Sequence, residues 1–254
     1  MNTVSSSSRT PHRWSLPGTF ESLETISTHP SHLVPWREWA DAGFKLSSYV
    51  FIGQRTSKLP VRIAVLAGLR SRDLGATRAL AKLLVELEVA PLAGADYALF
   101  SYAVTRQPEL DWQSDFGHDL PPGPPRESQT VARLIETDLK RNDVDGVISL
   151  ETNEHVNGFQ IETDSELIAA EVAWPALEVA GRFVPLAEEP VKVLGPGVLG
   201  YESGGERGIP KQMFALNIRT PQTSPPEDQV SAIVFSSIRV LKQYRELRRA
   251  TLDL

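Results

Sequence analysis

Residues 61–87 read VRIAVLAGLRSRDLGATRALAKLLVEL and contain two patterns in succession. Positions 61–69 are almost continuously apolar, which is typical of a strand buried on both faces of a parallel sheet. Positions 74–89 have helical spacing, with apolar residues on one face. That face carries four leucines: Leu80, Leu83, Leu84 and Leu87. A strand, a short polar loop and a helix in this order indicate an α/β protein.

The same alternation continues along the chain. Apolar runs predict further strands at 48–56, 97–105, 145–152 and 214–220. Helical spacing predicts helices over 127–141 and over 164–177, the second ending at Pro175. We therefore expect a mixed, mostly parallel central sheet with helices on both faces.

The final helix has the strongest start signal. Ser224 is the expected N-cap, Pro225 the first helical residue, and Glu227 the partner in a capping box. Its last turns carry Arg245, Arg248 and Arg249, which we interpret as a solvated end where cations suit the helix dipole.

The regions outside this alternation are rich in serine and proline. Residues 1–17 contain no apolar segment and predict a disordered tail, so we expect one domain over 18–254. Within it, the apolar residues of 18–46, including Trp36 and Trp39, predict short helices packed on the outside of the domain. Residues 106–126 form a polar, proline-rich connection.

Composition excludes several classes of protein. The 254 residues contain no cysteine, which rules out disulfides, thiol catalysis and cysteine-bound metals. A formal charge of −6 is unfavourable for nucleic-acid binding, and no apolar run is long enough to span a membrane. Because we see neither a membrane span nor a signal peptide, we expect a cytoplasmic protein.

Common catalytic motifs are absent. The sequence has no G-x-G-x-x-G after a strand, no G-x-x-x-x-G-K-[ST], no G-x-S-x-G and no H-E-x-x-H. Potential metal ligands gather only at 151–155 (ETNEH), with distant acidic and histidine residues as companions. Those companions are Asp111, Asp115, His118 and Asp119. A solvated acidic loop explains the same residues without a metal.

The order of elements resembles the zinc metallocarboxypeptidase superfamily, including its succinylglutamate desuccinylase/aspartoacylase-like branch. The resemblance rests on residues 61–87, 97–109 (YALFSYAVTRQPE), 143–162 (DVDGVISLETNEHVNGFQIE) and 214–221 (FALNIRTP). It implies zinc held by two histidines and one glutamate, with a fourth position open for the attacking water.

Every position that the resemblance links to chemistry departs from the family's pattern. Arg70 stands where the first histidine ligand is expected, and Asp73 stands where the glutamate ligand is expected. Glu151 takes the place of the third ligand, and Arg219 that of the general base. In the segment expected to bind the substrate carboxylate, Asp119-Leu-Pro-Pro lacks the asparagine and the arginine.

Arginine keeps its proton at usable pH, so it can be neither a zinc ligand nor a general base. We therefore expect Arg70, Asp73, Glu151 and Arg219 to form a charge-paired cluster in place of a metal.

The expected replacement of the metal site by a charge-paired cluster leaves two main functions. The first is a non-catalytic protein without cofactor that binds a peptide, a small acidic ligand or a protein partner. The alternative is a metal-dependent peptidase or amidohydrolase of the carboxypeptidase or deacylase type, with zinc relocated to Asp73, Glu151 and His155. A third possibility is an interaction module with a closed cleft, using Trp112 and the proline-rich segment 121–125.

Overall fold

The computed structural model describes residues 32–41, 44–53, 60–69, 73–92, 97–106, 126–195 and 213–252. Several predictions concern residues outside these ranges. The tail 1–17, most of the 106–126 connection, Arg70 and the Pro121–Pro125 segment with Trp112 are among them. None of the helices in the described ranges is long and apolar enough to cross a membrane.

The described strands form one eight-stranded sheet in the order β1-β2-β4-β3-β5-β8-β6-β7. Their bounds are β1 Leu33–Asp41, β2 Phe44–Ile52, β3 Val61–Ala67, β4 Tyr97–Arg106, β5 Gly146–Asn153, β6 Phe159–Thr163, β7 Leu186–Val193 and β8 Phe214–Pro221. The central strands β4, β3, β5 and β8 are mutually parallel. Antiparallel pairs join β1 to β2, β2 to β4 and β6 to β8. The predicted mixed, mostly parallel sheet is confirmed.

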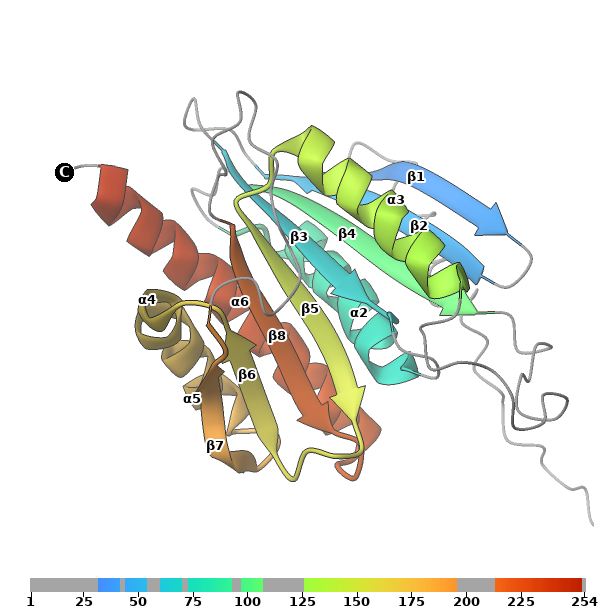
Figure 1. Cartoon of the computed structure of the whole chain (residues 1–254). Coiled ribbons are helices and arrows are strands. Elements are labelled where there is room, and N and C mark those ends of the chain that lie inside the picture. Colours follow the sequence, from blue (N-terminus) through green and yellow to red (C-terminus); the bar gives the residue numbers. More distant parts are fainter. Residues whose placement is uncertain are drawn as a thin grey trace, which may run out of the picture.

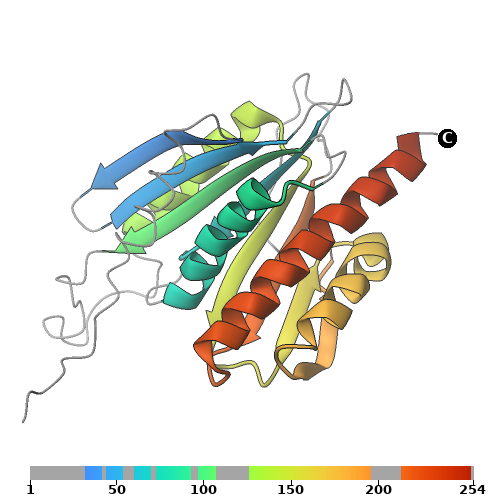
Figure 2. The ribbon, with the colours of Figure 1, turned by 180° about the vertical axis from the view of Figure 1, so that it is seen from behind.

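Helices cover both faces of the sheet, as expected. Helix α3 (Arg126–Asn142) lies on the face shown in Figure 1. The opposite face, shown in Figure 2, carries α2 (Leu74–Val89), α6 (Pro226–Leu252) and a segment of three short helices. Those three are α4 (Glu166–Ile168), the π-helix η1 (Ala169–Ala173) and α5 (Trp174–Ala180).

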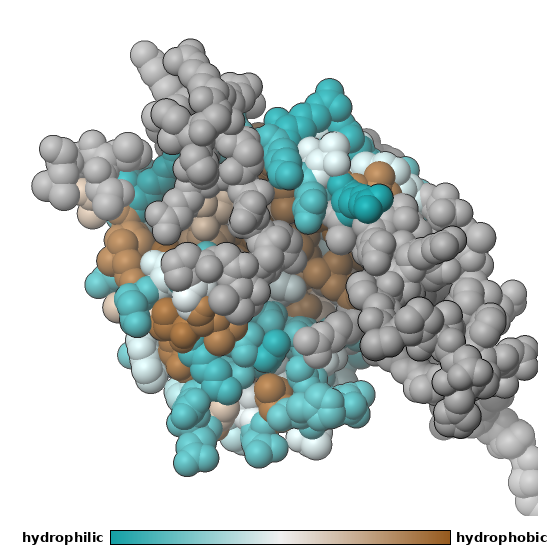
Figure 3. Space-filling model, viewed as in Figure 1, coloured by the Kyte–Doolittle hydropathy of each residue, from teal (hydrophilic) through white to brown (hydrophobic). Residues whose placement is uncertain are grey.

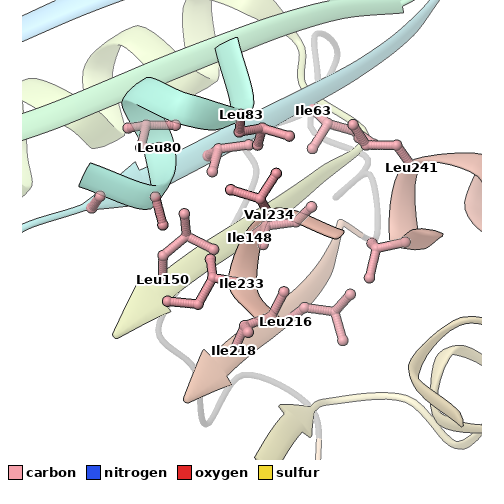
Figure 4. Packing of buried hydrophobic residues seen from close by; sticks show 14 of the residues in the cluster. Ile63, Leu80, Leu83, Ile148, Leu150, Leu216, Ile218, Ile233, Val234 and Leu241 are labelled. Carbon is pink, nitrogen blue, oxygen red and sulfur yellow. The ribbon is translucent and has the colours of Figure 1, made fainter. Parts of the chain in front are cut away.

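The larger hydrophobic core lies between the sheet and α2, α5 and α6. Figure 4 shows Leu80 and Leu83 of α2 packed near Ile148 and Leu150 of β5, with Val234 of α6 beside them. A second core, between the sheet and α3, includes Tyr102, Ile135 and Leu139. Because each strand alternates between these two faces, its polar residues can be assigned to one side.

The prediction of short helices in the N-terminal region is wrong where the structure describes it. Residues 33–41 form a strand paired with β2, and its register shifts between Pro35 and Arg37. That β-bulge places Trp36 and Trp39, three residues apart, on the side of α3. Apolar side chains three residues apart on one side are also typical of a helix, which explains the wrong prediction. The tryptophans do pack, as expected: the Trp36 ring meets Phe100 edge-on.

The helix predicted over 164–177 continues to Ala180 instead of ending at Pro175. Proline lacks an N–H and its ring collides with the carbonyl four residues earlier in a regular helix. Just before it, the Trp174 N–H donates to the Ala169 carbonyl, five residues back, in the wider turn of η1. We infer that this wider turn accommodates the proline.

Two predictions about the last helix need correction. Helix α6 begins at Pro226, one residue later than expected, and the Glu227 carboxylate pairs with Arg78 (3.1 Å). Near its other end, Arg248 is not simply solvated, because its guanidinium pairs with the buried carboxylate of Asp145.

Candidate functional site

The ends of β5, β8 and β6 bring four polar residues to one level of the sheet. Glu151 of β5 is in register with Arg219 of β8, while Asn217 of β8 is in register with Glu162 of β6. Apolar neighbours such as Ile218 enter the larger core, so these four side chains point to the opposite face. Figure 3 shows hydrophilic residues gathered over the lower part of that face. We call these four residues the ion-paired centre.

Arg219 joins two carboxylates in this centre. Its Nε lies 3.3 Å from Oε2 of Glu151, and its Nη1 lies 2.5 Å from Oε1 of Glu162. Both glutamate side chains are 7% exposed and that of Arg219 is 20% exposed. Because these three side chains are largely buried, their charges must be paired. An isolated buried charge is strongly unfavourable.

Asn217, within the centre, and Asn153, beside it, complete the hydrogen bonding of the charged groups. Asn217 contacts both glutamates through its amide group at 3.3 and 3.5 Å. With the amide turned over, its oxygen accepts from Arg219 Nε at 3.0 Å and from Nη2 at 3.2 Å. We assign this second orientation, because its contacts are shorter and supply acceptors to the guanidinium. Asn153 donates to Oε1 of Glu151 at 2.5 Å.

Asp73 has a different role. It caps α2, since its Oδ1 accepts from the Ala76 N–H at 3.0 Å and its Oδ2 accepts from the Thr152 N–H at 2.9 Å. The Thr152 hydroxyl donates a third hydrogen bond at 2.5 Å. Burial raises the pKa of Asp73, and the nearby charge of Glu151 acts in the same direction. Asp73 therefore fastens the start of α2 to the end of β5, beside the centre.

The structure brings together part of the cluster expected from the sequence. Arg219 pairs with Glu151, as predicted, and Asp73 lies near Glu151. Arg70 is outside the described residues. His155 does not join them: its side chain is 81% exposed and lies beside Glu154.

These residues do not fit the zinc site that the resemblance implies. In the described part of the chain, no three His, Cys, Asp or Glu side chains form a group able to hold a metal. Arg219 has no lone pair to offer, and both carboxylate oxygens of Asp73 accept hydrogen bonds from α2 or Thr152. The proposed relocated set of Asp73, Glu151 and His155 is likewise not assembled.

Glu162 and Asn217 were missed by sequence reasoning. Residues 159–163 alternate apolar and polar side chains (FQIET), which is a sequence signal for a strand. Even with that strand predicted, its place beside β8 would have remained unknown. The β6 strand follows β5 in sequence but pairs with β8 and β7.

Comparisons with known proteins concern the fold. No protein-family model and no curated protein matches the chain by sequence. Among solved structures, a candidate metallopeptidase from Shewanella denitrificans superposes with a TM-score of 0.59 at 13% identity, over 89% of each chain. A metallo-carboxypeptidase from Burkholderia cenocepacia gives 0.59 at 11% identity, over 92% of this chain and 70% of that one.

A third similar structure is a metallo-carboxypeptidase from Pseudomonas aeruginosa in complex with (2-guanidinoethylmercapto)succinic acid. It gives a TM-score of 0.51 at 12% identity, over 87% of this chain and 68% of that one. Similarity at this level of identity describes the backbone and leaves the chemistry of the site open. The chain thus has the α/β fold of the metallo-carboxypeptidases, as the order of its strands and helices led us to expect.

Proposed function

We propose that this protein is a non-catalytic relative of the metallo-carboxypeptidases that uses their fold to bind a peptide or a protein partner. The observation that carries the proposal is the position of Arg219, whose guanidinium lies between the buried carboxylates of Glu151 and Glu162.

The chemistry of these groups supports a loss of hydrolysis. A general base must take a proton from water, and a guanidinium that is always protonated cannot do so. Glu151 and Glu162 are carboxylates, but each has an oxygen in contact with the guanidinium of Arg219, and the second oxygen of Glu151 accepts a hydrogen bond from Asn153. As far as the described residues show, the centre therefore offers neither an available base nor a set of zinc ligands.

The same contacts help to choose between ligand classes. A small acidic ligand would need a site with an excess of positive charge. The ion-paired centre instead sets one guanidinium, that of Arg219, against the two carboxylates of Glu151 and Glu162. We therefore place a peptide or a protein partner ahead of a small acidic ligand.

Hydrolysis assays test this proposal. The full chain, incubated with zinc, would be given peptides with free C-termini and N-acyl amino acids, the substrates of carboxypeptidase-type and deacylase-type enzymes. We expect no zinc-dependent release of amino acid above the rate without protein. The matched variants are Glu151→Gln, which changes the ion-paired centre, and Glu154→Gln, which changes an exposed neighbour.

Turnover that Glu151→Gln abolishes and Glu154→Gln preserves would overturn the proposal. It would favour the alternative, a metal-dependent peptidase or amidohydrolase whose site uses Glu151. Turnover that neither variant changes would also contradict the proposal and place the active site elsewhere.

A further inference from the structure

The layer of helices behind the sheet exposes one continuous face. Figure 2 shows α6 and the α4–α5 segment on the same side of the sheet, and α5 and η1 both pack against α6. Their inner residues enter the larger core, so their remaining sides face away from it. We call this face the outer helical surface and define it by seven residues: Leu167, Glu171, Trp174, Glu178, Phe235, Arg239 and Lys242.

Three large apolar side chains lie on this surface. Leu167 is 53% exposed, Trp174 is 50% exposed and Phe235 is 37% exposed. Phe235 is held in place, because its ring stacks on Phe183 at 5.3 Å between centroids. An exposed tryptophan and phenylalanine on neighbouring helices are typical anchors of a protein interface.

Charges on the two halves of the surface have opposite sign. Residues 166–180, which form α4, η1 and α5, contain three glutamates and neither lysine nor arginine. On the α6 side, the charged residues of the surface are Arg239 and Lys242, and both are basic. Among the described residues, no ion pair joins Glu171 or Glu178 to Arg239 or Lys242.

We propose that the outer helical surface is the contact of a two-fold symmetric homodimer. In such an interface the same patch meets itself, so each feature must find its complement on the same surface. A two-fold axis that lies in the interface and runs along the boundary between the two halves places the acidic α4–α5 side of one copy on the basic α6 side of the other. The apolar side chains then meet near the middle, where water is excluded. This inference is independent of the proposed function.

Charge reversal gives a specific test. One variant, Glu171→Lys with Glu178→Lys, makes both halves of the surface basic. The other, Arg239→Glu with Lys242→Glu, makes both halves acidic. Each variant alone would repel its own copies, but the two together are complementary at both contacts.

Sedimentation equilibrium of the full chain is the measurement. We expect wild type to have twice the 28.0 kDa monomer mass, each charge-reversed variant to be monomeric, and an equimolar mixture of the two to be dimeric. A control with Glu136→Lys and Glu154→Lys, exposed residues outside this surface, should remain dimeric. The single variant Trp174→Ser should weaken the dimer about ten-fold or more, with circular dichroism confirming that every variant is folded.

Three results would overturn the proposal. The first is a wild-type monomer at a protein concentration of about 100 μM, well above the dissociation constant of an ordinary specific dimer. The second is a dimer that survives both charge reversals, which would place the contact elsewhere. The third is a mixture of the two variants that remains monomeric although each is folded.

Discussion

Arg219 shows how one residue determines the chemistry available at the site. Its guanidinium holds together two carboxylates that come from strands on either side of β8. Removing one member of a buried ion pair leaves the other charges without compensation, which costs more than the pair contributes when intact. The loss of Arg219 should therefore destabilise the protein more than the loss of an arginine from an exposed ion pair.

Substitution of Arg219 tests this dependence. Arg219→Met keeps much of the side-chain volume but leaves Glu151 and Glu162 facing each other, so we expect a loss of about 3 kcal/mol or more in the free energy of unfolding. The control is Arg78→Met, which breaks a pair with the largely exposed Glu227 and should cost about 1 kcal/mol or less. Urea denaturation measures both. Equal costs for the two variants would contradict a tightly paired centre.

Asp73 gives a prediction about pH. Its pKa lies above the ordinary value of 3.8 because burial opposes ionisation. A carboxyl group with a raised pKa contributes stability that is complete below its unfolded-state pKa and is lost as the pH rises through its folded-state pKa. The amide side chain introduced by Asp73→Asn does not titrate. The free energy of unfolding of wild type, minus that of Asp73→Asn, should therefore fall as the pH rises from about 3.5 to 7.

Urea denaturation at a series of pH values measures this difference. Both proteins carry the same other titratable groups, so most of the remaining pH dependence cancels. A difference that increases with pH would show that the hydrogen bonds from Thr152 and Ala76 outweigh burial at Asp73.

The residues of the centre differ in how far sequence could predict them. Glu151 and Arg219 each follow an apolar run, and parallel strands end at the same edge of a sheet, so their pairing could be predicted. Glu162 could not, because its strand turns back beside β8 rather than beside the strand that precedes it in sequence. The local pattern of apolar and polar residues does not show which strand, distant in sequence, will lie beside a given strand.

Elements with strong periodicity were predicted almost to the residue. The helix expected over 74–89 is α2, Leu74–Val89, and the apolar run beginning at residue 61 is β3. The predictions of elements were wrong where one local feature changes the regular spacing of residues along a strand or helix. The bulge at Pro35 gave strand β1 a spacing of three, and the π-turn of η1 allowed a helix to continue past Pro175.

The connection between β3 and α2 depends on one glycine. Gly68 has φ +74°, and a Cβ at this position would lie 2.2 Å from the carbonyl oxygen of Val104. Gly195 also has positive φ (+64°), but a Cβ there would meet nothing within 4 Å. Gly68→Ala should therefore combine backbone strain with a collision, and Gly195→Ala should suffer strain alone.

We expect Gly68→Ala to reduce the free energy of unfolding by about 2–4 kcal/mol, and Gly195→Ala by about 1 kcal/mol. Thermal or urea denaturation compares the two variants directly. If Gly68→Ala cost no more than Gly195→Ala, the close approach of Gly68 to β4 would be wrong.

At the scale of the whole molecule, the sheet separates the ion-paired centre from the outer helical surface. The ion-paired centre lies on the face turned away from α2, α5 and α6, whereas the outer helical surface lies on the far side of those helices. A binding function at the first face and self-association through the second are therefore compatible. The general α/β class, the mixed sheet and helices on both faces could be predicted from the sequence, since they follow from alternating strand and helix patterns.

The strand order could not be predicted in the same way. Long-range pairing of β6 with β8, and of β7 at the edge, depends on side-chain packing and on connections that periodicity does not specify. This order is what brings Glu162 to Arg219, and with it the arrangement that we interpret as incompatible with zinc.

The most direct test of that interpretation is a measurement of bound zinc. Protein purified without chelator, and again after incubation with zinc and dialysis, would be analysed for metal by mass spectrometry, with thermal unfolding recorded in parallel. We predict less than stoichiometric zinc and no rise in Tm. A resident metal at about 100 times its Kd would instead stabilise the fold by about 2.7 kcal/mol. One zinc per chain that survives dialysis, and is lost in Glu151→Gln, would contradict the ion-paired centre as a replacement for a metal.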